Sequence, residues 1–434
     1  MTWTFMPFRG LRYNTGKACE IAQVVAPPYD VISPRERDAF CDGHQFSIVH
    51  VELGREQPGD DEGNNKYTRA GAIFAEWEKA GVVRQDPEPA YYVYDQEFPL
   101  GERTLTRRAF FAALRLEPFG SRVLPHEETM PGPRADRLKL ITACPVNLSP
   151  IFGIYPDARN EVALLLNASL PREPLASFVD FAGVRQTLWR IQNPRVLSGL
   201  SQQMESRRLY IADGHHRYET ALLYRDLDTR IHGPLAPADA RNFVMIACVS
   251  ISDPGLVVLP AHRVIGGIPD FRYKTFLNKL SGQFDVRPVK ASGAAAADAL
   301  LREMSGKQFA FGFYADGKAN LVTLKNEDLA DLNPAKRSSP WKRLDVSILV
   351  WLILEQALGF THEDLANPER VRYVKDPAEA AQLVDSGSHQ LVCYLNPTRL
   401  DQLEQVAQAG ERMPPKSTYF YPKLLTGLVM RKLL

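Results

Sequence analysis

Apolar residues recur at helical spacing in the clearest element near the N-terminus. This stretch, YTRAGAIFAEWEKAG (67–81), carries an apolar side chain every three or four positions and ends in glycine, which commonly closes helices. Two short apolar runs before it, 24–26 and 47–51, predict extended segments. Polar runs at 54–65 and 84–89 predict loops, so this part of the chain is expected to mix helix and strand.

The middle of the chain alternates predicted strands and helices. Alternating polar and apolar residues over 90–118 predict a hairpin that turns near Leu100, Gly101 and Glu102. Apolar runs predict four more strands, at 149–156, 185–191, 209–212 and 243–251. Helical periodicity predicts three helices, at 133–144, 194–206 and 215–227.

The chain from residue 269 onward shows the same alternation. Helices are predicted after Thr398 and at 273–280, 291–304, 344–358 and 377–386. Strands are predicted at 309–315 and 390–396. This order of elements predicts a mixed fold that combines α/β and α+β sheets.

The length of 434 residues predicts two or three domains. We expect an N-terminal α/β segment at 1–118, followed by a catalytic core at 119–268 with an insertion near 156–208. A C-terminal α/β domain is expected at 269–434. Its tail at 413–428 is rich in side-chain donors, and we expect it to return to the functional site.

Charge and cysteine content argue against several classes of function. The 52 Lys and Arg residues balance 51 Asp and Glu residues, which disfavours DNA as a partner. Five scattered cysteines form no CxxC pair, so neither a zinc site nor a disulfide framework is indicated. No apolar run approaches the ~20 residues of a membrane span, and the N-terminus lacks a signal-peptide pattern. A cytoplasmic protein without a membrane partner is expected.

The stretch YIADGHHRYETAL (210–222) places unusual chemistry at a strand-to-helix turn. A helix N-terminus presents unpaired N–H groups and favours anions. Glycine lets the backbone approach a ligand closely, and arginine can bind two phosphate oxygens at once. The turn therefore predicts a phosphate-binding site made by Asp213, Gly214, His215, His216 and Arg217.

Two other interpretations of this turn stay open. In the first, Asp213 caps the helix, the histidines lie on the surface, and Arg217 pairs with a nearby glutamate, Glu205 or Glu219. In the second, Asp213 and the two histidines bind a metal. Adjacent helical residues point about 100° apart, which disfavours the metal site.

A second group of polar residues occurs in LPHEETMPGPRADRL (124–138). A loop carboxylate near a phosphate site suits a general base or a Mg²⁺ ligand, which makes Glu127, with its neighbour His126, a catalytic candidate. Arg134, on the following helix, is a candidate substrate contact. Helix capping or a surface ion pair is the alternative for the glutamates.

Two further segments offer candidate substrate contacts. APPYD presents Tyr29 and Asp30 from a backbone stiffened by prolines, with an Asx cap for a helix at Pro34 as the alternative. LPAHR offers His262 and Arg263 at the end of a strand, where a purely structural pair is the alternative.

The segment PPKSTYFYPKLLTG (414–427) concentrates donors near the C-terminus. Lys416, Ser417 and Thr418 match the last residues of a P-loop, but the preceding glycines of that motif are missing. We expect these three residues to form a second phosphate clamp and Tyr419 to contact the substrate. Tyrosines packed between domains and solvated lysines are the alternative.

Five motifs together resemble a bacterial and archaeal family labelled domain of unknown function 1015: APPYDVIS, LPHEET, ADGHHRYETAL, DPGLVVLPAHR and MPPKSTYFYPKLLTGL. They run nearly end to end. The stretch from about 119 to 250 also resembles the free serine kinases of the ParB/sulfiredoxin-like superfamily, because it has a PHE loop, a proline-led strand from Ser149 and a DGHHR turn. The resemblance implies a ParB/sulfiredoxin-like core embedded in a multidomain α/β protein.

The resemblance to the kinases also implies roles for individual residues. The PHE glutamate, which acts as base on the serine hydroxyl, corresponds to Glu127. The DGHHR turn, which holds the transferring phosphate, corresponds to 213–217, so His215 and His216 join the catalytic candidates. The insertion near 156–208 and the flanking domains depart from the small kinases, which leaves substrate and donor open.

The expected function is a small-molecule phosphotransferase, with L-serine and O-phosphoserine as the leading pair. The expected cofactors are Mg²⁺, bridging phosphate oxygens or held by Glu127 or Asp213, and ATP, ADP or pyrophosphate as donor or acceptor. Lys416 or Arg134 would offset developing charge. The alternatives are a phosphoester hydrolase and a non-enzymatic ParB-like nucleotide-binding regulator. The sequence does not specify the oligomeric state, and a homodimer is one option.

Overall fold

The computed structural model describes residues 4–18, 20–128 and 131–434, and its internal contacts divide the chain into two units. Unit 1 comprises Met1–Pro125, Thr129–Val257 and Pro422–Leu434. Unit 2 comprises His126–Glu128 and Val258–Tyr421. Thr129 of the LPHEET motif lies outside the described residues. The end of the chain returns to unit 1 after unit 2 is complete.

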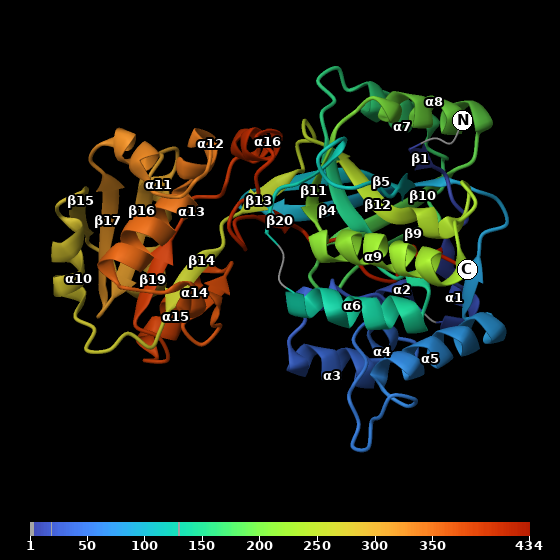
Figure 1. The fold of residues 1–434 in the computed structure, drawn as a ribbon, viewed down its shortest axis with the longest axis horizontal. Helices are drawn as coiled ribbons and strands as arrows, with labels where there is room; N and C mark the ends of the chain where they lie inside the picture. The colour runs from blue at the N-terminus through green and yellow to red at the C-terminus, as the bar shows by residue number, and fades with distance from the viewer. Residues whose placement is uncertain (1–3, 19, 129–130) are drawn as a thin grey trace. The chain divides into compact units, whose positions relative to one another are not determined.

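Unit 1 is built on a mixed sheet (Figure 1). Within the described residues its nine strands follow the order β6, β11, β8, β12, β5, β4, β10, β9, with β1 beside β5. Their bounds are β1 (Phe5–Met6), β4 (Tyr91–Leu100), β5 (Arg103–Arg115), β6 (Val123–Pro125), β8 (Ile151–Tyr155), β9 (Ala176–Val179), β10 (Arg185–Ile191), β11 (Leu209–Asp213) and β12 (Phe243–Ser250). The pairs β6–β11 and β8–β12 are parallel, and the remaining pairs are antiparallel. Strands from the predicted 1–118 and 119–268 segments therefore share one sheet.

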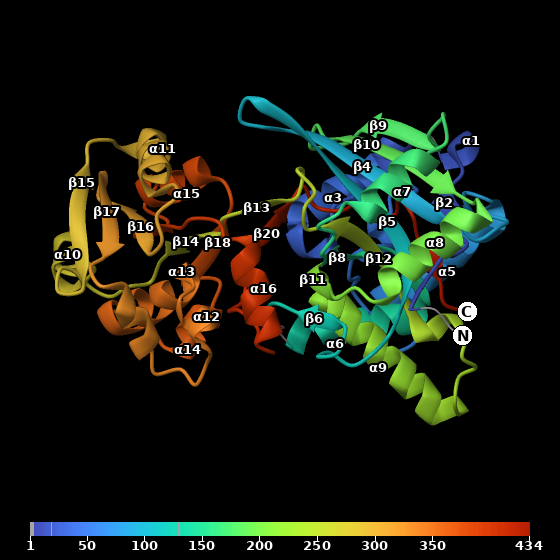
Figure 2. The same ribbon diagram turned by 90° about the horizontal axis from the view of Figure 1, so that it is seen from above.

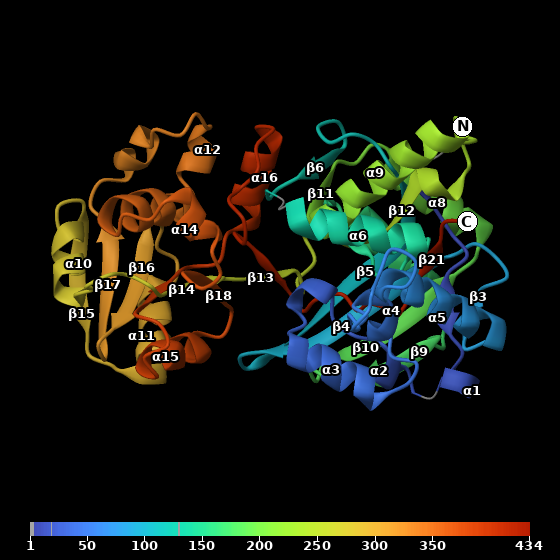
Figure 3. The same cartoon turned by 60° about the horizontal axis from the view of Figure 1, so that its bottom comes forward.

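The helices of unit 1 pack on this sheet and on one another. Their bounds are α1 (Thr15–Ala18), α2 (Ile21–Val24), α3 (Pro34–Gly43), α4 (Val49–Glu52), α5 (Lys66–Ala80), α6 (Pro131–Ala143), α7 (Glu161–Ser169), α8 (Pro194–Glu205) and α9 (His215–His232), with 3₁₀ turns at Tyr29–Val31 and Ala240–Asn242. Helix α6 contacts both α5 and α9, and α4 contacts α5 (Figure 3). Short ladders join β2 (Leu11–Tyr13) to β3 (Val83–Gln85) and β7 (Val146–Asn147) to β21 (Arg431–Lys432).

Unit 2 contains a second sheet, antiparallel throughout, in the order β15, β17, β16, β19, β14, β18. Its strands are β14 (His262–Ile265), β15 (Phe284–Val289), β16 (Ala310–Ala315), β17 (Lys318–Leu324), β18 (Val371–Val374) and β19 (Leu391–Tyr394). Its helices are α10 (Tyr273–Leu280), α11 (Gly293–Met304), α12 (Ser339–Lys342), α13 (Asp345–Ile348), α14 (His362–Ala366), α15 (Pro377–Asp385) and α16 (Leu400–Gln408), with a 3₁₀ helix at Glu327–Leu332. Helices α11 and α15 lie side by side (Figure 2). Two short strands, β13 (Val257–Leu259) and β20 (Tyr419–Tyr421), pair with each other.

The mixed α/β class is confirmed, and so are most predicted elements. The hairpin turns where Leu100 pairs with Arg103, and the four predicted central strands correspond to β8, β10, β11 and β12. Helix α5 begins at the cap Asn65, whose side chain accepts from two backbone N–H groups. It ends at Gly81, whose φ of 71° is left-handed, as a closing glycine requires.

Three local predictions need correction. The extended segment expected at 47–51 is wrong, because Val49–Glu52 forms the short helix α4. Its valines are buried in the core beneath α5, so packing overrides their preference for strands. Part of the predicted loop 84–89 belongs to β3, and the predicted helix 344–358 adopts π geometry over Leu349–Ala357 after α13.

No helix in the described part of the chain combines the length and the apolar composition needed to cross a bilayer. The four cysteines among the described residues are buried and unbridged: Cys41, Cys144, Cys248 and Cys393.

Candidate functional site

The DGHHR turn of unit 1 connects β11 to α9 through Gly214. The φ of Gly214 is 87°, a left-handed conformation that glycine adopts without steric penalty. Asp213 Oδ1 accepts a hydrogen bond from the Gly214 N–H at 2.7 Å. Gly214 itself is the N-cap residue and provides no side chain, so Asp213 does not cap the helix as the capping interpretation supposed.

Arg217 crosses this turn from the first turn of α9. Its Nη1 donates to Ser149 Oγ at 2.9 Å and to the Pro150 carbonyl, at the start of the proline-led strand. Its Nη2 lies 3.8 Å from Asp213 Oδ1. A Cβ atom at position 214 would approach the Arg217 guanidinium to 3.0 Å. The guanidinium therefore lies against Gly214, and a side chain at this position would have to displace it.

A lysine from the C-terminal segment completes the turn. Lys423 Nζ donates to Asp213 Oδ2 at 2.8 Å, and both side chains are largely buried. Gln96 donates to the Lys423 carbonyl at 3.0 Å, and the fully buried Arg107 donates to Gln96 and to the Pro422 carbonyl. Arg107 was not predicted as a site residue, whereas Lys423 belongs to the donor-rich segment 414–427, which was expected to supply a second phosphate clamp. A lysine inside the motif PKLLTGL was the available signal for Lys423.

Arg107 adds a buried positive charge beneath this segment. Burial lowers the pKa of Arg107 to about 10, with partial compensation from the acidic groups Tyr94, Asp253 and Asp213. It therefore stays protonated at neutral pH.

The two histidines lie in the first turn of α9, where His215 is buried and His216 is partly exposed. The surface location supposed for His215 in the capping interpretation is wrong.

Replacing Gly214 by alanine is expected to lower the free energy of unfolding by about 1 to 2 kcal/mol, because an L-residue is strained at this φ. The added methyl group should also displace Arg217 and weaken binding of O-phosphoserine. Gly183→Ala is the matched control, since Gly183 has a φ of 77° with no atom near its Cβ position. Urea unfolding and calorimetric titration should show similar destabilisation for both variants but weaker binding only for Gly214→Ala. Equal affinity in the two variants would contradict the role of Arg217.

Unit 2 collects a second set of predicted residues around Glu127. The backbone at 126–128 runs beside Met413, which donates to the His126 carbonyl at 2.7 Å and accepts from the Glu128 N–H at 3.2 Å. Glu127 Oε1 accepts a hydrogen bond from the Lys416 N–H at 2.9 Å. The PHE loop and the PPKST segment, far apart in sequence, therefore lie together.

His126 and Thr418 make a further contact within this set. The ring of His126 is buried, and its Nε2 lies 2.8 Å from Thr418 Oγ1 and 3.9 Å from Glu127 Oε2. The imidazole thus connects the tail to the candidate base.

Arg263 of β14 joins the same set, whereas His262 does not. Arg263 Nη2 donates to the Lys416 carbonyl at 3.1 Å, and its guanidinium lies 4.5 Å from the centre of the Tyr373 ring. Burial lowers the pKa of Arg263, and the nearby Tyr373 and Glu127 counteract this effect. His262 is buried against Tyr394, and burial lowers the pKa of His262 to about 3, so it stays neutral.

The residues of the tail make further local contacts. Lys416 has a φ of 58°, an uncommon conformation for a residue with a side chain, and its side chain is exposed. Ser417 Oγ donates to the Pro414 carbonyl at 2.6 Å. The ammonium of Lys375 lies 3.5 Å from the Tyr419 hydroxyl.

The remaining predicted residues lie in unit 1. The Tyr29 ring packs under the guanidinium of Arg137 at 4.0 Å, and burial raises the pKa of its hydroxyl. Asp30 is exposed and does not cap the helix at Pro34, because Ser33 and Glu36 form that capping box. Arg134 is half exposed, 3.9 Å from Glu219.

Strand pairing fixes where the two motifs begin. β6 ends at Pro125, which pairs in parallel with Ile211 of β11. Successive Cα atoms are about 3.8 Å apart, so the Cα of Glu127 lies within about 7.6 Å of the Cα of Pro125. Asp213 follows Ile211 by two residues in the same way. The PHE loop and the DGHHR turn therefore leave neighbouring strands at the same edge of the sheet.

Among the described residues, no three His, Cys, Asp or Glu side chains are grouped as a metal site would require.

Comparison with solved structures gives distant similarities. The chain matches a free serine kinase in complex with AMP at 12% identity and a TM-score of 0.32, covering 72% of this chain and 86% of that chain. A conserved hypothetical protein from Pyrococcus furiosus matches at 12% identity and 0.33, covering 73% and 92%. SbnI with a C-terminal truncation, from Staphylococcus aureus, matches at 11% and 0.36, covering 73% and 85%. Because these TM-scores lie below 0.5, we infer nothing about this chain's chemistry from them.

Sequence comparison identifies the family. Among curated proteins, none gives a significant match. Residues 5–347 match the family described as "Protein of unknown function (DUF1015)", and this match covers most of the chain. The motifs APPYD, PHE and DGHHR all lie within the matched residues. The chain therefore belongs to the DUF1015 family.

Proposed function

We propose that this protein transfers a phosphoryl group to or from the hydroxyl of a small metabolite, with L-serine and O-phosphoserine as the leading pair. One observation carries the proposal: the parallel pairing of β6 with β11 starts the PHE loop and the DGHHR turn at the same sheet edge. The turn supplies backbone N–H groups and cations, and the loop supplies a carboxylate. Phosphoryl transfer depends on these two kinds of group.

The proposed phosphate site is the turn 213–217 together with Lys423. Its cationic groups, Arg217 and Lys423, both lie beside Asp213. An incoming phosphate at the start of α9 would meet the helix N-terminus and both cations. His215 and His216 border the same helix start and are proposed to hydrogen-bond the phosphoryl oxygens.

The proposed base is Glu127. In transfer to the substrate, the hydroxyl gives its proton to the Glu127 carboxylate as its oxygen bonds to phosphorus, and the bond from phosphorus to the donor oxygen breaks. ATP leaves as ADP, ADP as AMP, and pyrophosphate as phosphate. The Lys416 N–H holds one carboxylate oxygen and so orients the carboxylate that is proposed to take the proton.

The residues of the turn fit a phosphate better than a metal ion. Asp213 is already bonded to the Lys423 ammonium and the Gly214 N–H. We therefore assign Mg²⁺ to the phosphate oxygens of the donor, where it would neutralise charge, rather than to this carboxylate.

Phosphorus NMR tests the proposal directly. The full-length protein is incubated with Mg²⁺ and O-phospho-L-serine, together with AMP, ADP, phosphate or no acceptor. We expect ADP, ATP or pyrophosphate to appear in the arm that contains the true acceptor. Free phosphate in every arm would overturn transfer in favour of hydrolysis by a Glu127-activated water. No turnover in any arm, combined with nucleotide-dependent thermal stabilisation, would overturn it in favour of a binding module.

A further inference from the structure

Unit 1 contains a pocket that borders Arg217 but is otherwise built from residues without a role in the proposed chemistry. Its interior volume is about 50 Å³, and it is partly open to solvent. Helices α4, α6 and α9 line it together with the segment from β7 to β8. Apolar side chains form much of the wall, and the polar groups that face it are Glu52, Arg137, Asn147, Ser149, Arg217 and Thr220. Half of the twelve lining residues are thus polar, which suits a small polar group of a ligand.

Glu52 is the unusual member of this wall. Its side chain is only 4% exposed, and a buried carboxylate requires compensation. Arg137 Nη1 donates to Glu52 Oε1 at 3.1 Å. Within the described residues, Glu52 Oε2 accepts no hydrogen bond. One carboxylate oxygen is therefore available to a ligand in the pocket.

Arg137 has less to offer a ligand, because four of its five N–H donors are occupied. Its Nε and Nη2 both donate to Asp136, and its Nη1 also donates to the Glu52 carbonyl at 3.0 Å. The Tyr29 ring covers one side of its guanidinium. Glu52 and Arg217 are thus the two other charged residues of the wall.

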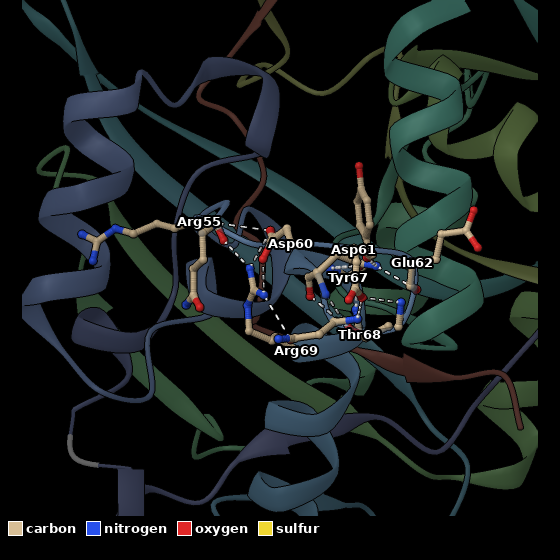
Figure 4. A network of polar contacts seen from close by, with 11 residues as sticks. Arg55, Asp60, Asp61, Glu62, Tyr67, Thr68 and Arg69 are labelled. Carbon is tan, nitrogen blue, oxygen red and sulfur yellow. Dashed lines mark hydrogen bonds and ion pairs between the residues drawn. The ribbon is translucent and has the colours of Figure 1, made fainter.

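The surrounding contacts hold Glu52 in place. The loop that follows α4 is fastened to α5, because Arg69 donates to both carboxylate oxygens of Asp60 and to the Arg55 carbonyl (Figure 4). From the same helix, the Tyr67 hydroxyl donates to Asp136 at 2.7 Å. A preorganised carboxylate can distinguish ligands more sharply than a mobile one.

We propose that this pocket receives the ammonium group of an amino-containing substrate, which Glu52 binds while Arg217 faces the phosphorylated end. The proposal deepens the proposed function, since it names primary amines as the substrate class of that site. A buried carboxylate with a free oxygen binds an ammonium more tightly than a neutral hydroxyl in the same position, because the hydrogen bond to the ammonium is assisted by charge. Glu52 is thus a specificity-determining residue. A purely structural Glu52–Arg137 ion pair, the competing interpretation, would give no such preference.

The test compares two ligands that differ only at this group. O-phospho-L-serine carries an ammonium where 3-phospho-L-glycerate, which has the same spatial arrangement at C2, carries a hydroxyl. Calorimetric titration of the full-length protein should show at least about tenfold tighter binding of O-phosphoserine, and Glu52→Gln should reduce this preference to less than about twofold. Glu56→Gln is the matched control, because Glu56 is a nearby exposed carboxylate paired with Lys66, and it should keep the preference.

The preference is the ratio of the affinities of the two ligands for one variant. A general loss of stability lowers both affinities and leaves this ratio unchanged. Should Glu52→Gln fail to fold, Glu52→Asp replaces it and should show a preference between that of the wild type and unity. Equal affinity for the two ligands in the wild type would overturn the proposal, as would an unchanged preference in the Glu52 variant. If the NMR assay shows phosphoryl transfer but the titration shows no preference for the amine, only this inference is overturned. If the titration shows the preference but the NMR assay shows no transfer, only the proposed function is overturned.

Discussion

Replacing Glu127 by glutamine is expected to lower turnover of O-phosphoserine by about 100- to 10,000-fold, the range attributed to a general base. Glutamine has the same shape and can still accept the Lys416 N–H bond at 2.9 Å, so the local backbone should not change. The variant loses only the carboxylate that takes the proton. Turnover is measured by the phosphorus NMR assay, and ligand affinity is measured by calorimetric titration.

Glu128→Gln is the matched control for this prediction. Glu128 is the adjacent carboxylate, it is 43% exposed, and it pairs with Arg337 at 2.8 Å. Its loss should change turnover by less than about twofold, because exposed ion pairs contribute little. In Glu127→Gln, affinity for O-phosphoserine should stay within a few-fold of the wild-type value. If affinity and turnover fell by the same factor, Glu127 would be a binding residue and not the base.

Local sequence signals predicted the elements of this protein well where packing agreed with propensity. Asn65 and Gly81 cap the two ends of α5, as capping rules require. Gly214 adopts the left-handed conformation expected in the turn between strand and helix. The segment at 47–51 shows the opposite case. Its β-branched residues favour a strand, but the Ile48 N–H donates to the Val24 carbonyl and the following valines enter the core as a helical turn. Tertiary contacts of this kind leave no periodic signal in the sequence.

The candidate site could also be predicted only where its residues are close in sequence. The DGHHR residues were predictable because they are adjacent in sequence, and their turn brings them together. The contact of Glu127 with Lys416 joins positions 289 residues apart, and no local pattern encodes such pairing. Glu52 was missed for a related reason. Glu52 follows an apolar run, and a charged residue at such a position normally lies on the surface. Its burial beside the buried Arg137 is evident only from the structure.

Replacing Gly255 by alanine should reduce the stability of unit 1 by about 3 kcal/mol, as expected for overpacking against a rigid wall. An added Cβ would lie 2.4 Å from the Thr106 carbonyl oxygen and 2.5 Å from the Arg107 nitrogen. Both atoms belong to the backbone of β5, so no side-chain rotation relieves the clash. The turn itself is fixed, because Asp253 accepts from the Gly255 N–H at 2.8 Å and from the Arg108 N–H at 3.2 Å.

Gly43→Ala provides the control, since a Cβ there meets no atom within 4 Å and its φ is not left-handed. Its stability should change by less than about 0.5 kcal/mol. Hydrogen–deuterium exchange resolves the effect, because Gly255→Ala should accelerate exchange in β5 and β12 while β16 and β17 of unit 2 keep their protection. The displaced β5 also carries Arg107, which holds the Pro422 carbonyl beside Lys423. Phosphate-ligand affinity should therefore fall with stability in Gly255→Ala, and unchanged affinity would show that the lysine is positioned independently of β5.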